Sequence, residues 1–263
     1  MPARTGLKIT FLGTGTSTGV PMIGCDCAVC QSTDPRDNRL RCSLWMQTPE
    51  LQWVVDPGPD FRTQCLRAGV KHLDAVLITH PHTDHIMGFD DLRRFTFGEN
   101  EIMPVYASVE TMEALRRVFD FAFNGNNRYA GYLKPDPREV SGPFLLGATT
   151  ITPLPVEHGR VMTTGFLFQH QSGARVAYLP DCKRIPDATL AIMDGVDMLI
   201  VDALRRRIHP THFNVEESLA AARAVRAKKT YFTHLSHELS HAELEAELPP
   251  DVRVASDGLV LEL

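Results

Sequence analysis

The sequence predicts an α/β fold in a single domain, with two β-sheets inside and helices outside. Strand-like apolar runs occur in groups along the 263 residues, and helical patterns lie between them. No segment of disordered composition separates the two halves, so the domain is expected to span residues 1–263. A chain of this length can bury a large hydrophobic core.

The elements of the first half follow from hydrophobic patterning and from turn residues. Residues 8–12 predict a first strand, which ends in the glycine-rich stretch 13–19. Residues 43–47 and 52–55 predict a hairpin, which ends at the Asp-Pro-Gly-Pro stretch 56–59 because proline and glycine favour turns. The remaining elements are strands over 74–79 and 104–107, helices near 90–97 and 109–122, and a surface loop over 124–143 that is rich in Gly, Asn and Pro.

The second half shows the same pattern of strands with helices between them. The predicted strands lie near 149–156, 164–169, 174–179, 197–201 and 229–233, with two short strands within 252–263. Helices are predicted over 215–227 and 241–247. Both halves are therefore expected to have the same α/β character.

Composition and charge exclude a membrane span and argue against nucleic acid. The apolar runs fall short of the roughly 18–20 residues that cross a bilayer. The N-terminal segment lacks the apolar core of a signal peptide, so a cytoplasmic location is expected. A net charge of −5 gives no attractive field for a nucleic acid, so a nucleic-acid partner is not expected.

The stretch ITHPHTDHIMGF over residues 78–89 carries the strongest functional signal, because it places His80, His82, Asp84 and His85 within six positions directly after an apolar run. A strand alternates its side chains between two faces, so His80 and His82 can point the same way. A following turn then carries Asp84 and His85 to a second point. The alternative is a polar loop that caps the strand, but clustered imidazoles repel on protonation, whereas a metal stabilises them as neutral rings. The stretch therefore predicts a site for two metals.

Three later residues repeat this placement at strand ends. His158 follows ITPLPVE, Asp181 follows RVAYLP, and His234 follows TYFT. An isolated histidine is more often a surface or hydrogen-bonded residue. Side chains from separate strand ends can nevertheless converge on one edge of a sheet sandwich. We therefore expect these three residues to complete the metal centre.

Three of the cysteines, Cys25, Cys27 and Cys30, lie within six positions of a loop around 24–30. In a reducing compartment such a trio is not expected to form disulfides. Three thiolates so close together indicate a tetrahedral zinc site that lacks one ligand. The fourth ligand must come from elsewhere in the chain.

Together these motifs resemble the metallo-β-lactamase superfamily. The resemblance rests on HPHTDH, His158, Asp181, His234 and on Asp56 within VVDPG, and it covers nearly the whole chain. It implies a four-layer αββα sandwich. Four further stretches resemble one branch of the superfamily, which contains the phosphoribosyl cyclic phosphate phosphodiesterase of phosphonate breakdown. They are FLGTGTSTGVPMIGCDCAVC, YLPDCKRIPD, HPTHFNVEESL and THLSHELSH.

The resemblance implies two active-site metals and one structural zinc. It assigns the first metal to His80, His82 and His158, the second to Asp84, His85 and His234, and the bridging position to Asp181. It implies that Asp56 orients the ligands without binding metal itself. The ligands that it implies for the structural zinc are Cys25, Cys27, Cys30 and His237. The active-site ions are expected to be zinc or manganese, and a homodimer is compatible with the branch.

The function implied is that of a phosphodiesterase acting on a small cyclic phosphodiester, either a ribosyl 1,2-cyclic phosphate or a cyclic nucleotide. Two divalent ions about 3.5–4 Å apart can hold a bridging hydroxide and neutralise charge on a phosphate. Besides Asp181 and Asp84, the expected catalytic residue is His212, which would protonate the leaving group. Arg205 and His209 are expected to contact the substrate. Alternatively, one of the two histidines caps the helix that begins near Asn214.

Other functions stay open at this point. A nuclease that trims transfer RNA ends shares the strand-end ligands, but it predicts an RNA-gripping insertion and a basic surface that the sequence does not show. A non-hydrolytic, metabolite-binding protein of quinone-cofactor biosynthesis shares the cysteine-type zinc site. That branch departs from the complete ligand set, which this sequence retains. Thioester and lactam hydrolysis also remain open, since fold does not fix substrate.

Overall fold

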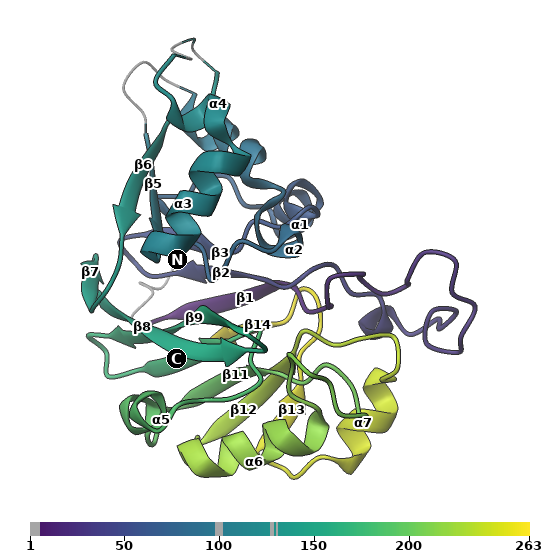
Figure 1. Cartoon of the computed structure of the whole chain (residues 1–263). Coiled ribbons are helices and arrows are strands. Elements are labelled where there is room, and N and C mark those ends of the chain that lie inside the picture. The colour runs from purple at the N-terminus through teal and green to yellow at the C-terminus, as the bar shows by residue number, and fades with distance from the viewer. Residues whose placement is uncertain (1–5, 98–101, 127–128, 130) are drawn as a thin grey trace.

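The computed structural model describes residues 6–97, 102–126, 129 and 131–263. Within this part of the chain, two mixed sheets of seven strands each lie face to face (Figure 1). The strand order is β14-β1-β2-β3-β4-β5-β6 in the first sheet and β13-β12-β11-β10-β9-β8-β7 in the second. The C-terminal strand β14 thus pairs with β1, the first strand of the chain, in the first sheet.

The first sheet is built mainly from the first half of the sequence. Its strands are β1 (Lys8–Gly13), β2 (Ser43–Gln47), β3 (Gln52–Val55), β4 (Ala75–Leu77), β5 (Met103–Ala107), β6 (Pro135–Glu139) and β14 (Val260–Glu262). Its outer face is covered by α1 (Phe61–Ala68), α2 (Thr83–Ile86), the 3-10 helix η2 (Phe89–Thr96), α3 (Val109–Val118) and α4 (Asp120–Phe123). A long loop, which contains the short 3-10 helix η1 (Pro35–Asp37), leaves the body between β1 and β2 (Figure 1).

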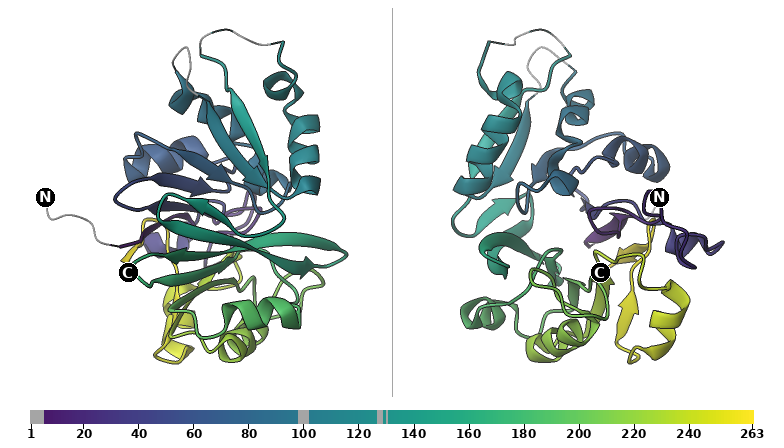
Figure 2. Two further views of the ribbon diagram at one scale, coloured as in Figure 1. Left: turned by 90° about the vertical axis from the view of Figure 1, so that its left-hand side faces the viewer. Right: turned by 45° about the vertical axis from the view of Figure 1, so that its right-hand side comes forward.

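The second sheet comes entirely from the second half. Its strands are β7 (Phe144–Leu146), β8 (Thr149–His158), β9 (Val161–His170), β10 (Arg175–Leu179), β11 (Met198–Asp202), β12 (Lys229–Thr233) and β13 (Val252–Val254). Its helices are α5 (Asp187–Met193), α6 (Val215–Val225) and α7 (His241–Glu247). Figure 2 shows from two further directions that these helices lie on the side away from the first sheet.

Three hydrophobic clusters occupy the three interfaces between the four layers. Strand β3 illustrates how alternation builds them: Trp53 and Val55 face the second sheet, while Val54 faces the helices. The second sheet buries the third cluster against its own helices. The predicted four-layer αββα sandwich is therefore confirmed.

Several predicted boundaries were wrong. The expected surface loop over 124–143, of which residues 127, 128 and 130 lie outside the described part, contains β6, paired in parallel with β5. Strand β6 reads PDPRE, and an edge strand tolerates prolines because it needs fewer backbone donors. The helix expected near 90–97 is a 3-10 helix, and the helix expected over 109–122 divides into α3 and α4.

Helices α1 and α5 and strand β7 were not predicted. Helix α1 reads FRTQCLRA and buries only Phe61, Gln64 and Cys65, so its apolar stripe is too narrow to stand out in the sequence. Within the described residues, no helix is long and apolar enough to cross a membrane.

Candidate metal centre

The histidines and aspartates singled out in the sequence converge at one edge of the sandwich. His80 and His82 follow β4, and Asp84 and His85 lie on the short helix α2. His158 is the last residue of β8, Asp181 follows β10, and His234 follows β12. Their ligand atoms form two groups, each within 4.8 Å: His80, His82, His158 and Asp181 in one, and Asp84, His85 and His234 in the other. We call these seven residues the buried centre, because all of them except the exposed His82 are buried.

The carboxylate of Asp181 lies between the two groups. Its Oδ2 is 3.6 Å from His80 Nε2 and 3.8 Å from His158 Nε2. Its Oδ1 is 3.1 Å from His85 Nε2 and 3.4 Å from His234 Nε2. One oxygen therefore faces each group, as a bridging carboxylate requires.

Asp56 holds this arrangement from behind. Its Oδ2 accepts hydrogen bonds from His85 Nδ1 at 2.8 Å and from Thr79 Oγ1 at 2.7 Å, and its Oδ1 accepts from the Thr79 amide at 2.8 Å. These bonds fix the His85 tautomer so that Nε2 faces the site. Asp56 does not belong to either ligand group.

Two other histidines are oriented in the same way. His158 Nδ1 donates to the Thr211 carbonyl at 2.8 Å, and His80 Nδ1 lies 3.0 Å from Thr79 Oγ1. Backbone strain adds to this picture, because Asp56 and His234 have φ angles of 59° and 57°. Left-handed conformations are uncommon for residues other than glycine and concentrate at functional sites.

The electrostatics of the buried centre fit divalent cations. Burial disfavours a charged Asp181, but His234 and His85 outweigh it and hold the pKa of this carboxyl well below its usual range. Burial opposes protonation of His234, yet Asp181 and Asp84 raise its pKa to about 9. The carboxylates therefore favour positive charge at His234 and at His85, whose pKa is also raised, and a divalent metal ion would supply that charge in place of protons.

Buried atoms in the same place lack hydrogen bonds. Within the described residues, His85 Nε2, His234 Nε2 and Asp181 Oδ1 have no hydrogen-bond partner. Unpaired buried polar atoms are costly and call for an explanation. Imidazole nitrogens and a carboxylate oxygen that converge without hydrogen bonds are a suitable donor set for a divalent metal.

His212 lies beside the buried centre and is paired with Asp202, which sequence reasoning missed. Asp202 Oδ2 accepts from His212 Nδ1 at 2.6 Å, which leaves Nε2 facing Asp181 Oδ2 at 3.9 Å. Burial, together with His234, lowers the pKa of His212 to about 4. Asp202 ends the apolar run MLIVD, so the strand-end rule that found Asp181 could also have found it.

The other predicted substrate contacts lie farther out on the same loop. His209 is half-buried, and its ring centroid is 5.2 Å from that of His212. Arg205 forms an ion pair with Glu238 at 3.4 Å and donates to the Ile208 carbonyl. Neither histidine caps α6, because Asn214 and Glu217 form a capping box there.

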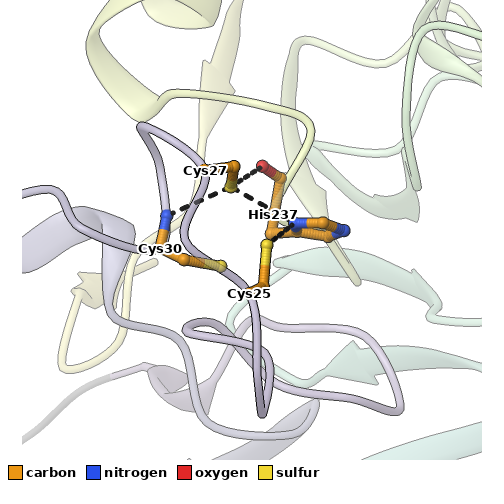
Figure 3. Close-up of side chains that lie close together, drawn as sticks. All are labelled: Cys25, Cys27, Cys30 and His237. Carbon is orange, nitrogen blue, oxygen red and sulfur yellow. Dashed lines mark hydrogen bonds between the residues drawn. The ribbon is translucent and has the colours of Figure 1, made fainter.

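The cysteine site combines two segments of the chain (Figure 3). Cys25, Cys27 and Cys30 come from the long loop after β1, and His237 comes from the segment after β12. The Sγ atoms of Cys25 and Cys27 lie 3.2 and 3.3 Å from His237 Nδ1. The Cys30 amide donates to Cys27 Sγ, and with the hydrogen bond to His237 it lowers the pKa of that thiol to about 6. All four ligand atoms lie within 4.8 Å of one another, as a tetrahedral zinc site would require.

The two sites share one segment of backbone. Leu235, between His234 and His237, donates to the Thr14 carbonyl at 3.0 Å and accepts from the Thr16 amide at 3.1 Å. The loop that carries the cysteines is therefore hydrogen-bonded to the strand end that carries His234.

Comparison with known proteins agrees with this geometry. The family described as the β-lactamase superfamily domain matches residues 52–235. The crystal structure of a diphosphatase from the PhnP family is 41% identical, with a TM-score of 0.90 over 98% of this chain and 97% of that one.

Two curated relatives are also similar. An octanoyltransferase of Porphyromonas gingivalis is 35% identical over 96% of this chain, which spans only 51% of that protein's length. Coenzyme PQQ synthesis protein B of Methylobacterium nodulans is 28% identical over 74% of this chain and 72% of its own length.

Proposed function

The chain belongs to the metallo-β-lactamase superfamily, and from this premise we propose that it is a metal-dependent phosphodiesterase acting on a small cyclic phosphodiester. A ribosyl 1,2-cyclic phosphate or a cyclic nucleotide has the required chemistry. The observation that carries the proposal is the position of Asp181, whose two oxygens face separate histidine groups. That arrangement suits two ions and a phosphate between them.

We propose two divalent ions in the buried centre, zinc or manganese, and one structural zinc in the cysteine site. His80, His82 and His158 would hold the first ion, Asp84, His85 and His234 the second, and Asp181 both. When bound, the ions supply a nucleophilic water at neutral pH and neutralise charge on the phosphate. Asp56 keeps the His85 ring in place during this work.

His212 is the proposed proton donor to the leaving oxygen. Because Asp202 accepts from Nδ1, only Nε2 is free to carry a proton toward the substrate. The low pKa of the free ring rises when an anionic phosphate binds beside it. Arg205 would reach a phosphate only by sharing its guanidinium with Glu238.

Hydrolysis of a diphosphate is a second candidate, favoured by the 41% identity to a PhnP-family diphosphatase. Both reactions place a phosphoryl group between two ions and differ in the leaving group. When a diphosphate is hydrolysed, the leaving group is a phosphate, which departs as a stabilised anion, whereas a sugar alkoxide needs a proton from His212. The two candidates therefore differ in how far they depend on His212.

The test is hydrolysis of bis(p-nitrophenyl) phosphate, a set of cyclic ribose phosphates and a set of diphosphates by protein of measured metal content. We expect metal-dependent turnover of the cyclic phosphodiesters, lost in Asp181→Ala. Turnover of the diphosphates alone would favour the second candidate. No turnover in either set, with two ions bound per chain in the buried centre, would overturn both in favour of another ester or a binding role.

A further inference from the structure

A pocket of about 660 Å³ opens next to His80 and His82. One wall is the β8–β9 hairpin, which contributes Pro153, Pro155, Val161 and Met162. The first turn of α3 and the residue before it also line the pocket, through Ser108, Glu110 and Thr111. Since two proposed metal ligands, His80 and His82, are among the lining residues, a ligand in this pocket borders the buried centre.

A hydrogen bond links one residue of the pocket to the buried centre. Thr163, which also lines it, donates from Oγ1 to the Asp181 carbonyl at 2.9 Å. His212 is not among the residues that line the pocket, and its Nε2 lies 3.9 Å from Asp181 Oδ2. The proton donor therefore lies outside the pocket, and the pocket is left for a part of the substrate that His212 does not serve.

The charge of the pocket is unusual for a site next to a phosphate. Among its described lining residues there is no lysine and no arginine, and Glu110 supplies the only carboxylate. The Glu110 side chain is exposed and has no ion pair or hydrogen bond within the described part of the chain. A second phosphate placed beside Glu110 would meet its negative charge, and no basic side chain among the described lining residues would offset that charge.

The remaining walls suit a group that is uncharged and partly apolar. Val161 and Met162 are 51% and 56% exposed, which leaves apolar surface for a ligand to cover. Hydroxyl groups of Ser141 and Thr111 also line the pocket. Apolar faces with a few hydroxyls match a sugar, which has both apolar C–H faces and hydroxyls.

We propose, building on the proposed phosphodiesterase function, that this pocket takes the uncharged, hydroxylated part of the substrate and that Glu110 rejects substrates with a second phosphate there. The substrate class narrows to cyclic phosphodiesters whose sugar carries no further phosphate at that end. Discrimination by a like charge is negative selection and needs no new contact to the preferred substrate.

The test compares ribose 1,2-cyclic phosphate with its 5-phosphate, which differ only in the second phosphate. We expect wild-type kcat/KM to be at least about tenfold lower for the 5-phosphate, with a ratio that shrinks as salt rises. Glu110→Lys should abolish or reverse this preference. Glu113→Lys is the matched control, because Glu113 is exposed on the same helix, makes the same charge change and does not line the pocket.

The two proposals fail in different ways. Equal kcat/KM for both substrates, or a preference unchanged in Glu110→Lys, would overturn the pocket proposal. The turnover itself would still support the proposed phosphodiesterase function. If neither substrate nor bis(p-nitrophenyl) phosphate is hydrolysed, the proposed phosphodiesterase function is wrong. The same two compounds then serve as ligands in calorimetry, where equal affinity or absent binding would also overturn the pocket proposal.

Discussion

The buried centre and the cysteine site gather their ligands in opposite ways. In the buried centre the side chains of His85, His234 and Asp181 are at most 3% exposed and come from separate strand ends or a short helix. In the cysteine site three of four ligands come from one loop, and Cys25, Cys27 and His237 are only half-buried.

The two sites also differ in what supports the ligands. Asp56, Thr79 and the Thr211 carbonyl orient the histidines of the buried centre from behind. Apart from His237 itself, the thiols of the cysteine site receive hydrogen bonds from backbone amides, that of Met22 on Cys30 Sγ and that of Cys30 on Cys27 Sγ. The side chains around the buried centre thus hold its ligands in place, whereas in the cysteine site we expect the proposed zinc to contribute more to the order of the loop.

The largest effect is expected for Asp181→Ala. Removal of the carboxylate between the two groups should lower phosphodiesterase kcat/KM by at least about 10³-fold, because both ions lose a shared ligand. Metal analysis should show fewer ions per chain while the cysteine site keeps its own. Asp187→Ala, which changes an exposed aspartate of α5, is the control. Unchanged turnover in Asp181→Ala would contradict the bridging role.

His212→Ala should follow, with a size that depends on the leaving group. Turnover of a cyclic ribose phosphate should fall by about 10²- to 10⁴-fold, because its alkoxide needs a proton. Turnover of bis(p-nitrophenyl) phosphate should fall much less, since nitrophenolate leaves without one. Full activity of the variant on both substrates would rule out the proton-donor role.

Asp56→Asn tests the support behind the buried centre. Asparagine has one acceptor oxygen where the carboxylate has two, so its NH2 group would face either the Thr79 amide or His85 Nδ1, and metal affinity or activity should fall by about 10- to 100-fold. Thermal unfolding and metal titration of the buried centre measure the loss. If affinity and activity stay at wild-type values, organisation by the fold is not what distinguishes this site.

Cys27→Ser tests the cysteine site by the same logic. Loss of one thiolate should release one zinc and reduce the free energy of unfolding by at least about 2 kcal/mol. Limited proteolysis should then cut the loop near residues 22–32, and Gln31→Ala, an exposed change in that loop, should leave it intact. A stable, uncut loop in zinc-free Cys27→Ser protein would break the contrast between the two sites.

The smallest effect concerns His241, which lies on α7 shortly after the shared segment. This histidine is buried, and its Nδ1 accepts from Arg39 Nη2 at 3.1 Å. Burial, together with the Arg39 charge, lowers its pKa from 6.5 to about 4. The unfolded chain thus takes up this proton first as pH falls, so stability is full above pH 6.5 and declines toward pH 4.

We expect this contribution to the free energy of unfolding to stay below about 2 kcal/mol, because solvent screens part of the interaction, and to disappear in His241→Asn. Denaturant unfolding at pH 7 and at pH 4.5 measures it as the difference between wild type and variant. An identical pH dependence in His241→Asn would show that this ring does not titrate on unfolding.

Most strands and the ligand types could be predicted because they depend on neighbours in the chain. Residues 43–47, 52–55, 229–233 and 241–247 have the predicted bounds. Strand β6 was missed because its prolines are acceptable only at a sheet edge, and edge position depends on the order of strands. Asp202 ends an apolar run as Asp181 does, but only the folded chain shows that it pairs with His212.

The sequence by itself determined the apolar runs, the polar residues that end them and the cysteine trio, since periodicity and residue chemistry are local properties. Only the tertiary structure decided which of these residues meet. It placed one oxygen of Asp181 toward each histidine group, paired His212 with Asp202, and brought Glu110 and Met162 into the lining of one pocket. Those meetings depend on how distant strands pair and pack, which no short stretch of the chain encodes.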